Sequence, residues 1–121
     1  MKYLLLVAHG SRREASNEEV RELTNVMAKQ YHDFDAVSSA FLELATPLIP
    51  DGIRDAVAQG ADEVVVLPYF LSAGRHVVTD VPSEVDSVRD EFPQVSIKIA
   101  PYLGVAESIP ATLLEQARKA G

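Results

Sequence analysis

Apolar residues recur along the chain in two patterns, short continuous stretches and longer stretches with helical spacing. The first stretch, Leu4 to Ala8, is unbroken, which is typical of a buried parallel strand. Alternating or β-branched stretches at 36–42, 63–67 and 95–100 predict three further strands. Apolar residues three or four positions apart predict helices up to Tyr31, from Ile49 to Gly60, from about Asp80 to Phe92, and from Ile109 to Gly121.

Local signals indicate where these helices begin and end. Ser16 and Glu19 have the spacing of a capping box, so the first helix is expected to begin near Ser16. Gly60 stands where a C-terminal glycine cap belongs. Pro82 is tolerated only if the regular helix begins close to Asp80. The chain therefore reads as four strand–helix units in succession.

Four alternating units predict an α/β fold with one four-stranded parallel sheet and helices on both faces. We expect the strand order 2-1-3-4, which makes the first and third strands neighbours at the point where the winding direction reverses. The length of 121 residues fits a single domain over 1–121. The expected architecture is a half-unit of flavodoxin-like type.

Charge and composition narrow the classes of partner. A formal net charge of −7 argues against a nucleic-acid binder, which would need a basic face to displace counterions. No apolar stretch approaches a membrane-spanning length, and the stretch after Lys2 lacks a small-residue cleavage site. We therefore expect no membrane partner and a cytoplasmic location. The absence of cysteine excludes disulfides and thiolate-ligated metal centres within this chain.

Candidate chemistry lies in the loops that follow the first and third strands. His9 follows the first strand and His76 ends the loop after the third, so the expected strand order brings them face to face at the carboxyl edge of the sheet. Two neutral imidazoles are an incomplete ligand set for a divalent transition metal, which suits a metal in transit more than a closed structural site. Glu43, at the end of the second strand, could reach the same edge as a ligand or proton acceptor.

Sequence motifs along nearly the whole chain support a family resemblance. They are AHGSR at 8–12, FLEL with a following proline at 41–47, the glycine-bounded strand at 60–67, and PYFLSAGRHVVTDVP at 68–82. In order and spacing these motifs resemble the short sirohydrochlorin cobaltochelatases, the CbiX family. The resemblance implies a chelatase-like fold and catalytic roles for His9, His76 and Glu43, with the metal bound by His9 and His76.

The resemblance also implies an activity, the insertion of cobalt into sirohydrochlorin during cobalamin synthesis. Iron insertion for siroheme, or nickel insertion into a tetrapyrrole, are possible variants. No tightly bound cofactor is expected, since the divalent metal is a substrate. Guanidinium groups on the two loops, including Arg13, are expected to bind the substrate's carboxylates, and apolar side chains, including Tyr102, to face its ring. The residues expected to bind substrate are Ser11, Arg12, Arg75, Tyr69, Phe70 and Leu71.

Two other functions stay open at this point. A strand ending in His-Gly before a small hydroxyl residue also occurs in histidine-type phosphatases, although Ala8 stands where that chemistry wants an arginine. A non-catalytic carrier of metal or tetrapyrrole would use the same two histidines without turnover. Because one four-stranded unit offers only a shallow crevice for a large flat macrocycle, we also expect a homodimer.

Overall fold

The computed structural model describes residues 1–121 and contains one four-stranded parallel sheet. The strands are hydrogen-bonded in the order β2-β1-β3-β4, and every neighbouring pair is parallel. The predicted fold class and strand order are therefore confirmed. The strands are β1 (Lys2–Ala8), β2 (Ala36–Phe41), β3 (Glu63–Pro68) and β4 (Ser96–Ile99).

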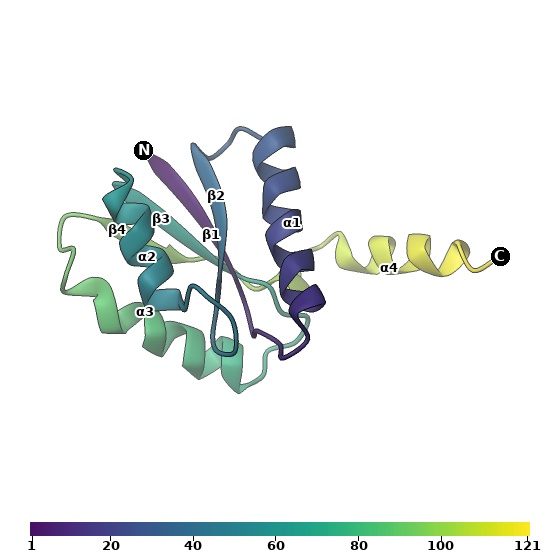
Figure 1. Ribbon diagram of the computed structural model, residues 1–121. Helices are drawn as coiled ribbons and strands as arrows, with labels where there is room; N and C mark the ends of the chain where they lie inside the picture. The colour runs from purple at the N-terminus through teal and green to yellow at the C-terminus, as the bar shows by residue number, and fades with distance from the viewer.

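Helices cover both faces of the sheet, as right-handed crossovers require. Figure 1 shows α1 on one side of the strands and α2 with α3 on the other. No helix is both long and apolar enough to cross a membrane. The helices are α1 (Glu14–Gln30), α2 (Ile49–Ala58), α3 (Val81–Arg89) and α4 (Ile109–Arg118), with a π-helical turn at His76–Asp80 and a 3-10 turn at Leu103–Val105.

The hydrophobic core lies mainly between the sheet and the α2/α3 layer. In β1 every residue from Tyr3 to Ala8 is buried, because alternate side chains enter the packing on opposite faces of the sheet. Gly52 lets α2 approach the sheet closely, since a Cβ there would lie 2.9 Å from the Ala40 Cβ. The core residues from the other elements include Ile49, Ile53, Val64, Val66, Val81, Val85, Val88 and Ile97.

The start of α1 differs from the sequence prediction. The helix begins at Glu14, and Arg13 is its N-cap residue without a side-chain capping hydrogen bond, so the capping box predicted at Ser16 is wrong. The backbone before the helix is instead held by Asn17, whose side chain makes two hydrogen bonds to the Ser11 backbone. The regular helix α3 begins at Val81, next to the predicted start at Asp80, and a π-helical turn from His76 precedes it.

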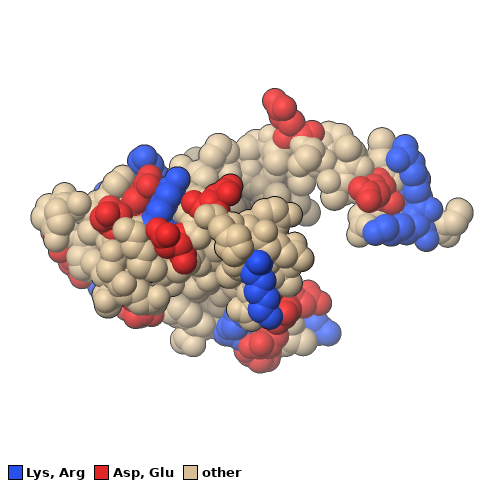
Figure 2. All heavy atoms as spheres, turned by 90° about the horizontal axis from the view of Figure 1, so that it is seen from above, with Lys and Arg blue, Asp and Glu red and all other residues tan.

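The last helix forms where its apolar spacing predicts but does not pack on the sheet. None of its residues is buried, and Leu113 and Leu114 are 61% and 58% exposed. Figure 1 shows α4 pointing away from the strands, and Figure 2 shows this arm standing apart from the rest of the molecule. Acidic and basic side chains are interspersed over the face visible in Figure 2. The fourth strand–helix unit is therefore present, but its helix has no partner within the chain.

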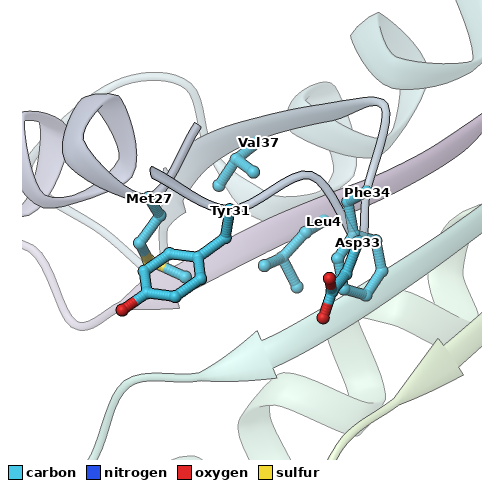
Figure 3. A pocket seen from close by; sticks show the side chains of 6 residues that line it. All are labelled: Leu4, Met27, Tyr31, Asp33, Phe34 and Val37. Atoms are coloured by element: carbon cyan, nitrogen blue, oxygen red, sulfur yellow. The ribbon is translucent and has the colours of Figure 1, made fainter. Parts of the chain in front are cut away.

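An apolar pocket of about 220 Å³ lies between the end of α1 and the beginnings of β1 and β2 (Figure 3). It is lined by Leu4, Met27, Tyr31, Asp33, Phe34 and Val37. This is the amino edge of the parallel strands, opposite the edge where ligands bind in open α/β sheets. The pocket contains no histidine, whereas His9 and His76 line a pocket at the other edge of the sheet.

Candidate functional site

His9 and His76 meet at the carboxyl edge of the sheet. His9 follows β1, His76 opens the helical turn that comes after the β3 loop, and β1 and β3 are paired strands. The ring centroids of the two imidazoles are 4.6 Å apart with an interplanar angle of 60°. The side chains are 40% and 42% exposed, so a hydrated ion can reach them. The juxtaposition predicted from the winding of the sheet is present.

Both imidazoles are oriented through Nδ1. His9 Nδ1 is 2.9 Å from the Gly10 carbonyl oxygen, and His76 Nδ1 is 2.8 Å from Asp80 Oδ2. A carbonyl or carboxylate oxygen can only accept, which assigns the Nδ1 proton to each neutral ring. The Nε2 lone pair of each ring is then available as a ligand. Histidines that bind metals commonly have this arrangement, with the second nitrogen held by a backbone carbonyl or a carboxylate.

Glu43 joins the pair from the end of β2. Its Oε1 lies 3.3 Å from His9 Nε2, and its side chain is 60% exposed. With the His9 proton on Nδ1 and Glu43 ionised, both facing atoms carry lone pairs. A proton or a metal ion between them removes the repulsion. His9 and Glu43 are therefore chemically suited to exchanging a bound proton for a metal ion, or the reverse.

Gly10 allows the loops after β1 and β2 to come together. Its φ of +94° is in the region that favours glycine, and a Cβ at this position would lie 1.7 Å from the Glu43 carbonyl oxygen. The Glu43 N–H donates to the His9 carbonyl oxygen at 3.1 Å, which continues the β1–β2 hydrogen bonding beyond the strands. The short distance between the His9 ring and the Glu43 carboxylate thus requires a residue without a side chain at position 10, where the two loops touch.

Asn17 anchors the loop that carries His9, a role that sequence reasoning missed. The side chain is 2% exposed; its amide nitrogen donates to the Ser11 carbonyl at 2.8 Å, and its oxygen accepts the Ser11 N–H at 2.9 Å. The Ser11 hydroxyl, predicted to bind substrate, accepts a hydrogen bond from the Arg13 N–H at 3.0 Å and so helps to hold the loop conformation. Side-chain hydrogen bonds to Glu14 lower the pKa of its carboxyl below the ordinary 4.5; the bond from the Arg21 guanidinium has the larger effect and the bond from the Asn17 amide the smaller. In the sequence Asn17 is one of several polar residues in the first turns of the helix, and only its burial in the structure distinguishes it from them.

A pocket of about 210 Å³ opens beside the two histidines. Its lining is His9, Leu42, Glu43, His76, Asp80, Ser83 and Glu84. No group of three or more His, Asp or Glu side chains is placed to hold a metal ion together, so Glu43 does not complete the histidine pair as a third ligand. An open set of two imidazoles with a carboxylate beside it leaves coordination positions vacant, which fits an ion that must be passed on.

The aromatic loop after β3 places apolar side chains next to His76. Tyr69, Phe70 and Leu71 line a hollow of about 280 Å³ together with Leu103. The Phe70 ring is 6.1 Å from the His76 ring at an interplanar angle of 26°. Leu71 is 70% exposed. Tyr102 lines a neighbouring apolar hollow of about 490 Å³ with Leu67, Pro101, Leu103, Val105, Ala106 and Glu107.

The three predicted arginines differ in their surroundings. Arg75 is 81% exposed, with its Nε 4.0 Å from Asp80 Oδ2. Arg12 is exposed and makes no side-chain hydrogen bond or ion pair. Arg13 donates to the Ser16 hydroxyl at 3.2 Å. Arg12 and Arg75 are therefore the guanidinium groups on these loops that are most accessible to an external anion.

Known proteins resemble this chain over most of its length. It is 42% identical over 101 residues to the chloroplastic sirohydrochlorin ferrochelatase of Arabidopsis thaliana, covering 84% of this chain and 44% of the relative. It is 34% identical over 124 residues to the sirohydrochlorin cobaltochelatase of Priestia megaterium, covering 100% of this chain and 39% of the relative. The crystal structure of a CbiX protein from Marinobacter aquaeolei VT8 has a TM-score of 0.84 and 26% identity, covering 99% of this chain and 97% of that one.

The chain thus spans less than half the length of the two named chelatases and nearly all of the solved CbiX chain. The family model described as CbiX matches residues 3–120, which include every residue of the site described above. The resemblance drawn from the sequence motifs is confirmed. The chain belongs to the CbiX family.

Proposed function

We propose that this chain inserts a divalent metal ion into sirohydrochlorin. The observation that carries the proposal is the meeting of His9 and His76, with ring centroids 4.6 Å apart, beside the Glu43 carboxylate. The ferrochelatase of A. thaliana and the cobaltochelatase of P. megaterium are both named for sirohydrochlorin, which supports this choice of substrate.

Metal capture is the first step. The Nε2 atoms of His9 and His76 replace water molecules on the hydrated ion, since each ring carries its proton on Nδ1 and offers a lone pair at Nε2. Only neutral imidazoles bind the ion, so capture releases any proton held at Nε2. The remaining coordination positions keep water until the nitrogens of the macrocycle take them.

Proton removal is the second step. A divalent ion that enters the ring replaces two N–H protons, so charge is conserved only if a base accepts both of them. Glu43, with Oε1 3.3 Å from His9 Nε2, is the nearest carboxylate, and each imidazole becomes a base again when it releases the metal. Because the Glu43 side chain is 60% exposed, it can pass protons on to solvent.

Substrate binding combines a local positive charge with an apolar surface. Sirohydrochlorin carries several carboxylates, and a chain of net charge −7 repels it overall. Arg12 and Arg75 are accessible guanidinium groups on the two loops that carry the histidines, and they can bind carboxylates as forks. Tyr69 and Phe70 line the hollow next to His76, where the face of a macrocycle can lie.

Cobalt is the metal we assign to the reaction, in cobalamin biosynthesis. Imidazole and carboxylate ligands bind cobalt, iron and nickel alike, and the relatives are named for both iron and cobalt. The test is an anaerobic insertion assay with sirohydrochlorin and each of the three divalent ions, followed by the absorbance of the ring. Multiple turnovers, fastest with cobalt, are expected. One turnover with retained product would identify a carrier, and no insertion with any ion would reject the proposal.

We further propose that the chain acts as a homodimer in the cytoplasm. The apolar side of α4, with Leu113 and Leu114 more than half exposed, has no partner within the chain, and a second copy can cover it. If α4 of each copy packs on the other copy in a symmetric dimer, the interface would need to bury about 1,200 Å² or more in total. Light scattering should give twice the chain mass, and Leu113→Asp together with Leu114→Asp should reduce it to one chain. A wild-type mass of one chain at micromolar concentration would contradict the dimer.

A further inference from the structure

We infer that Asp80 is a positioning residue that sets the tautomer and the direction of the His76 ring. Asp80 Oδ2 lies 2.8 Å from His76 Nδ1, and the Asp80 side chain is only 34% exposed. This inference rests on the proposed function for its catalytic consequence. Its structural content, a proton held on Nδ1 and a lone pair at Nε2, does not depend on the substrate.

The contact lies within a π-helical turn. The Val81 N–H donates to the His76 carbonyl, five residues back, so the turn is wider than an α-helical one. The His76 and Asp80 side chains, four residues apart, meet across this turn. Such turns in longer helices are frequent at functional sites. The wide turn here begins with a predicted metal ligand and ends with the carboxylate that contacts it.

The backbone on the Asp80 side of the turn is fixed by the core. Val81, the next residue, is 0% exposed, and so is Val85 one turn later in α3. On the His76 side, the preceding residue, Arg75, is 81% exposed. The firmly held carboxylate therefore orients the less restrained imidazole, and not the reverse.

Asp80 is the one hydrogen-bond partner that the structure gives His76 Nδ1. The neighbouring Phe70 and His9 rings, at 6.1 Å and 4.6 Å, make no hydrogen bond to this atom, and neither do Ser83 and Glu84, which line the same pocket. Arg75, with its Nε 4.0 Å from the same carboxylate oxygen, is a donor. Without Asp80 nothing holds the proton on Nδ1, and the ring is free to adopt the other tautomer or rotate.

The expected consequence is weaker metal binding. Loss of an outer partner of a metal-binding histidine typically costs about 10–100-fold in metal affinity or activity. Asp80→Ala removes the acceptor, and Asp80→Asn keeps an acceptor oxygen of the same shape. Because Asp80 makes no side-chain capping bond to α3, the alanine variant removes no helix cap. Asp86→Ala on the same helix is the matched control, since that carboxylate pairs only with Arg89.

The experiment measures the His76 tautomer by ¹H–¹⁵N NMR of the metal-free protein, and the Co²⁺ affinity by titration. The three histidines of the chain are distinguished by the signal that is missing in His76→Gln. Wild type, Asp80→Asn and Asp86→Ala should show the proton on Nδ1 of His76. Asp80→Ala should lose this signature and bind Co²⁺ about 10–100-fold more weakly, with Asp80→Asn between it and wild type.

Each outcome either supports or overturns the inference. An unchanged His76 tautomer and Co²⁺ affinity in Asp80→Ala would overturn it, as would a wild-type ring with its proton on Nε2. If Asp80→Ala does not fold, the Co²⁺ affinity of Asp80→Asn still decides: it must lie below that of wild type, because a neutral amide accepts less strongly than a carboxylate, and a wild-type affinity would overturn the inference. These measurements need no tetrapyrrole, so a failure of metal insertion would reject the proposed function while leaving the role of Asp80 intact.

Discussion

Substitution of Gly10 by alanine tests how the loops after β1 and β2 are held together. The new Cβ would lie 1.7 Å from the Glu43 carbonyl oxygen, a backbone atom that cannot rotate away. The residue would also keep a φ of +94°, which costs a non-glycine residue about 1–3 kcal/mol. Forced displacement of packed backbone adds about 1–3 kcal/mol. We therefore expect the free energy of unfolding to fall by about 2–6 kcal/mol in total.

Two other glycines provide matched controls for this measurement. Gly60 has a φ of +106° but nothing within 4 Å of the added Cβ, and Gly74 has neither feature. Urea unfolding followed by circular dichroism should rank the losses as Gly10→Ala, then Gly60→Ala, then Gly74→Ala. Equal losses for Gly10→Ala and Gly60→Ala would refute the contact with Glu43 as the cause. Under native conditions Gly10→Ala should also insert metal more slowly than Gly60→Ala, since it moves Glu43 relative to His9.

Three further predictions concern stability. Ile53→Ala empties a fully buried position and should lower the free energy of unfolding by about 2–5 kcal/mol, measured by urea denaturation. Arg54 lowers the pKa of Glu91 below its ordinary 4.5, so that carboxylate stabilises the fold above this pH and less so as the pH falls through the lowered value. The melting temperatures of wild type and Glu91→Gln should therefore converge in acid, and a gap that stays constant down to full protonation would contradict this. Asn17→Ala leaves the Ser11 backbone N–H and carbonyl without their partner and should cost about 1–3 kcal/mol, with slower metal insertion.

Sequence patterns predicted most of the fold because they reflect burial. The unbroken stretch from Leu4 to Ala8 is buried on both faces of the sheet, and this fixes it as an interior strand. The strand order followed from the alternation of units and the handedness of crossovers. The start of α1 could not be predicted from Ser16, because the buried Asn17 side chain supplies the hydrogen bonds that hold the preceding loop. For α4, apolar spacing predicts a helix but does not say what covers it.

The candidate site was predictable where it depends on topology. His9 and His76 follow neighbouring strands, so any sheet with this order brings them to one edge. The contact of Asp80 with His76 has the four-residue spacing of helical side-chain pairs, but the predicted helix began only at about Asp80 and left His76 in the loop before it. The approach of Glu43 to His9 likewise depends on the backbone conformation of Gly10, which becomes visible only in three dimensions.

We propose that His9 and His76 together hold the metal that is inserted. The most direct measurement is the initial rate of Co²⁺ insertion into sirohydrochlorin by His9→Ala, His76→Ala and the control His32→Ala, whose histidine is exposed and outside the site. Circular dichroism spectra should show that all three variants are folded. His9→Ala and His76→Ala should each lose most of the insertion rate, and His32→Ala should keep it. Wild-type rates in both His9→Ala and His76→Ala would contradict the proposal.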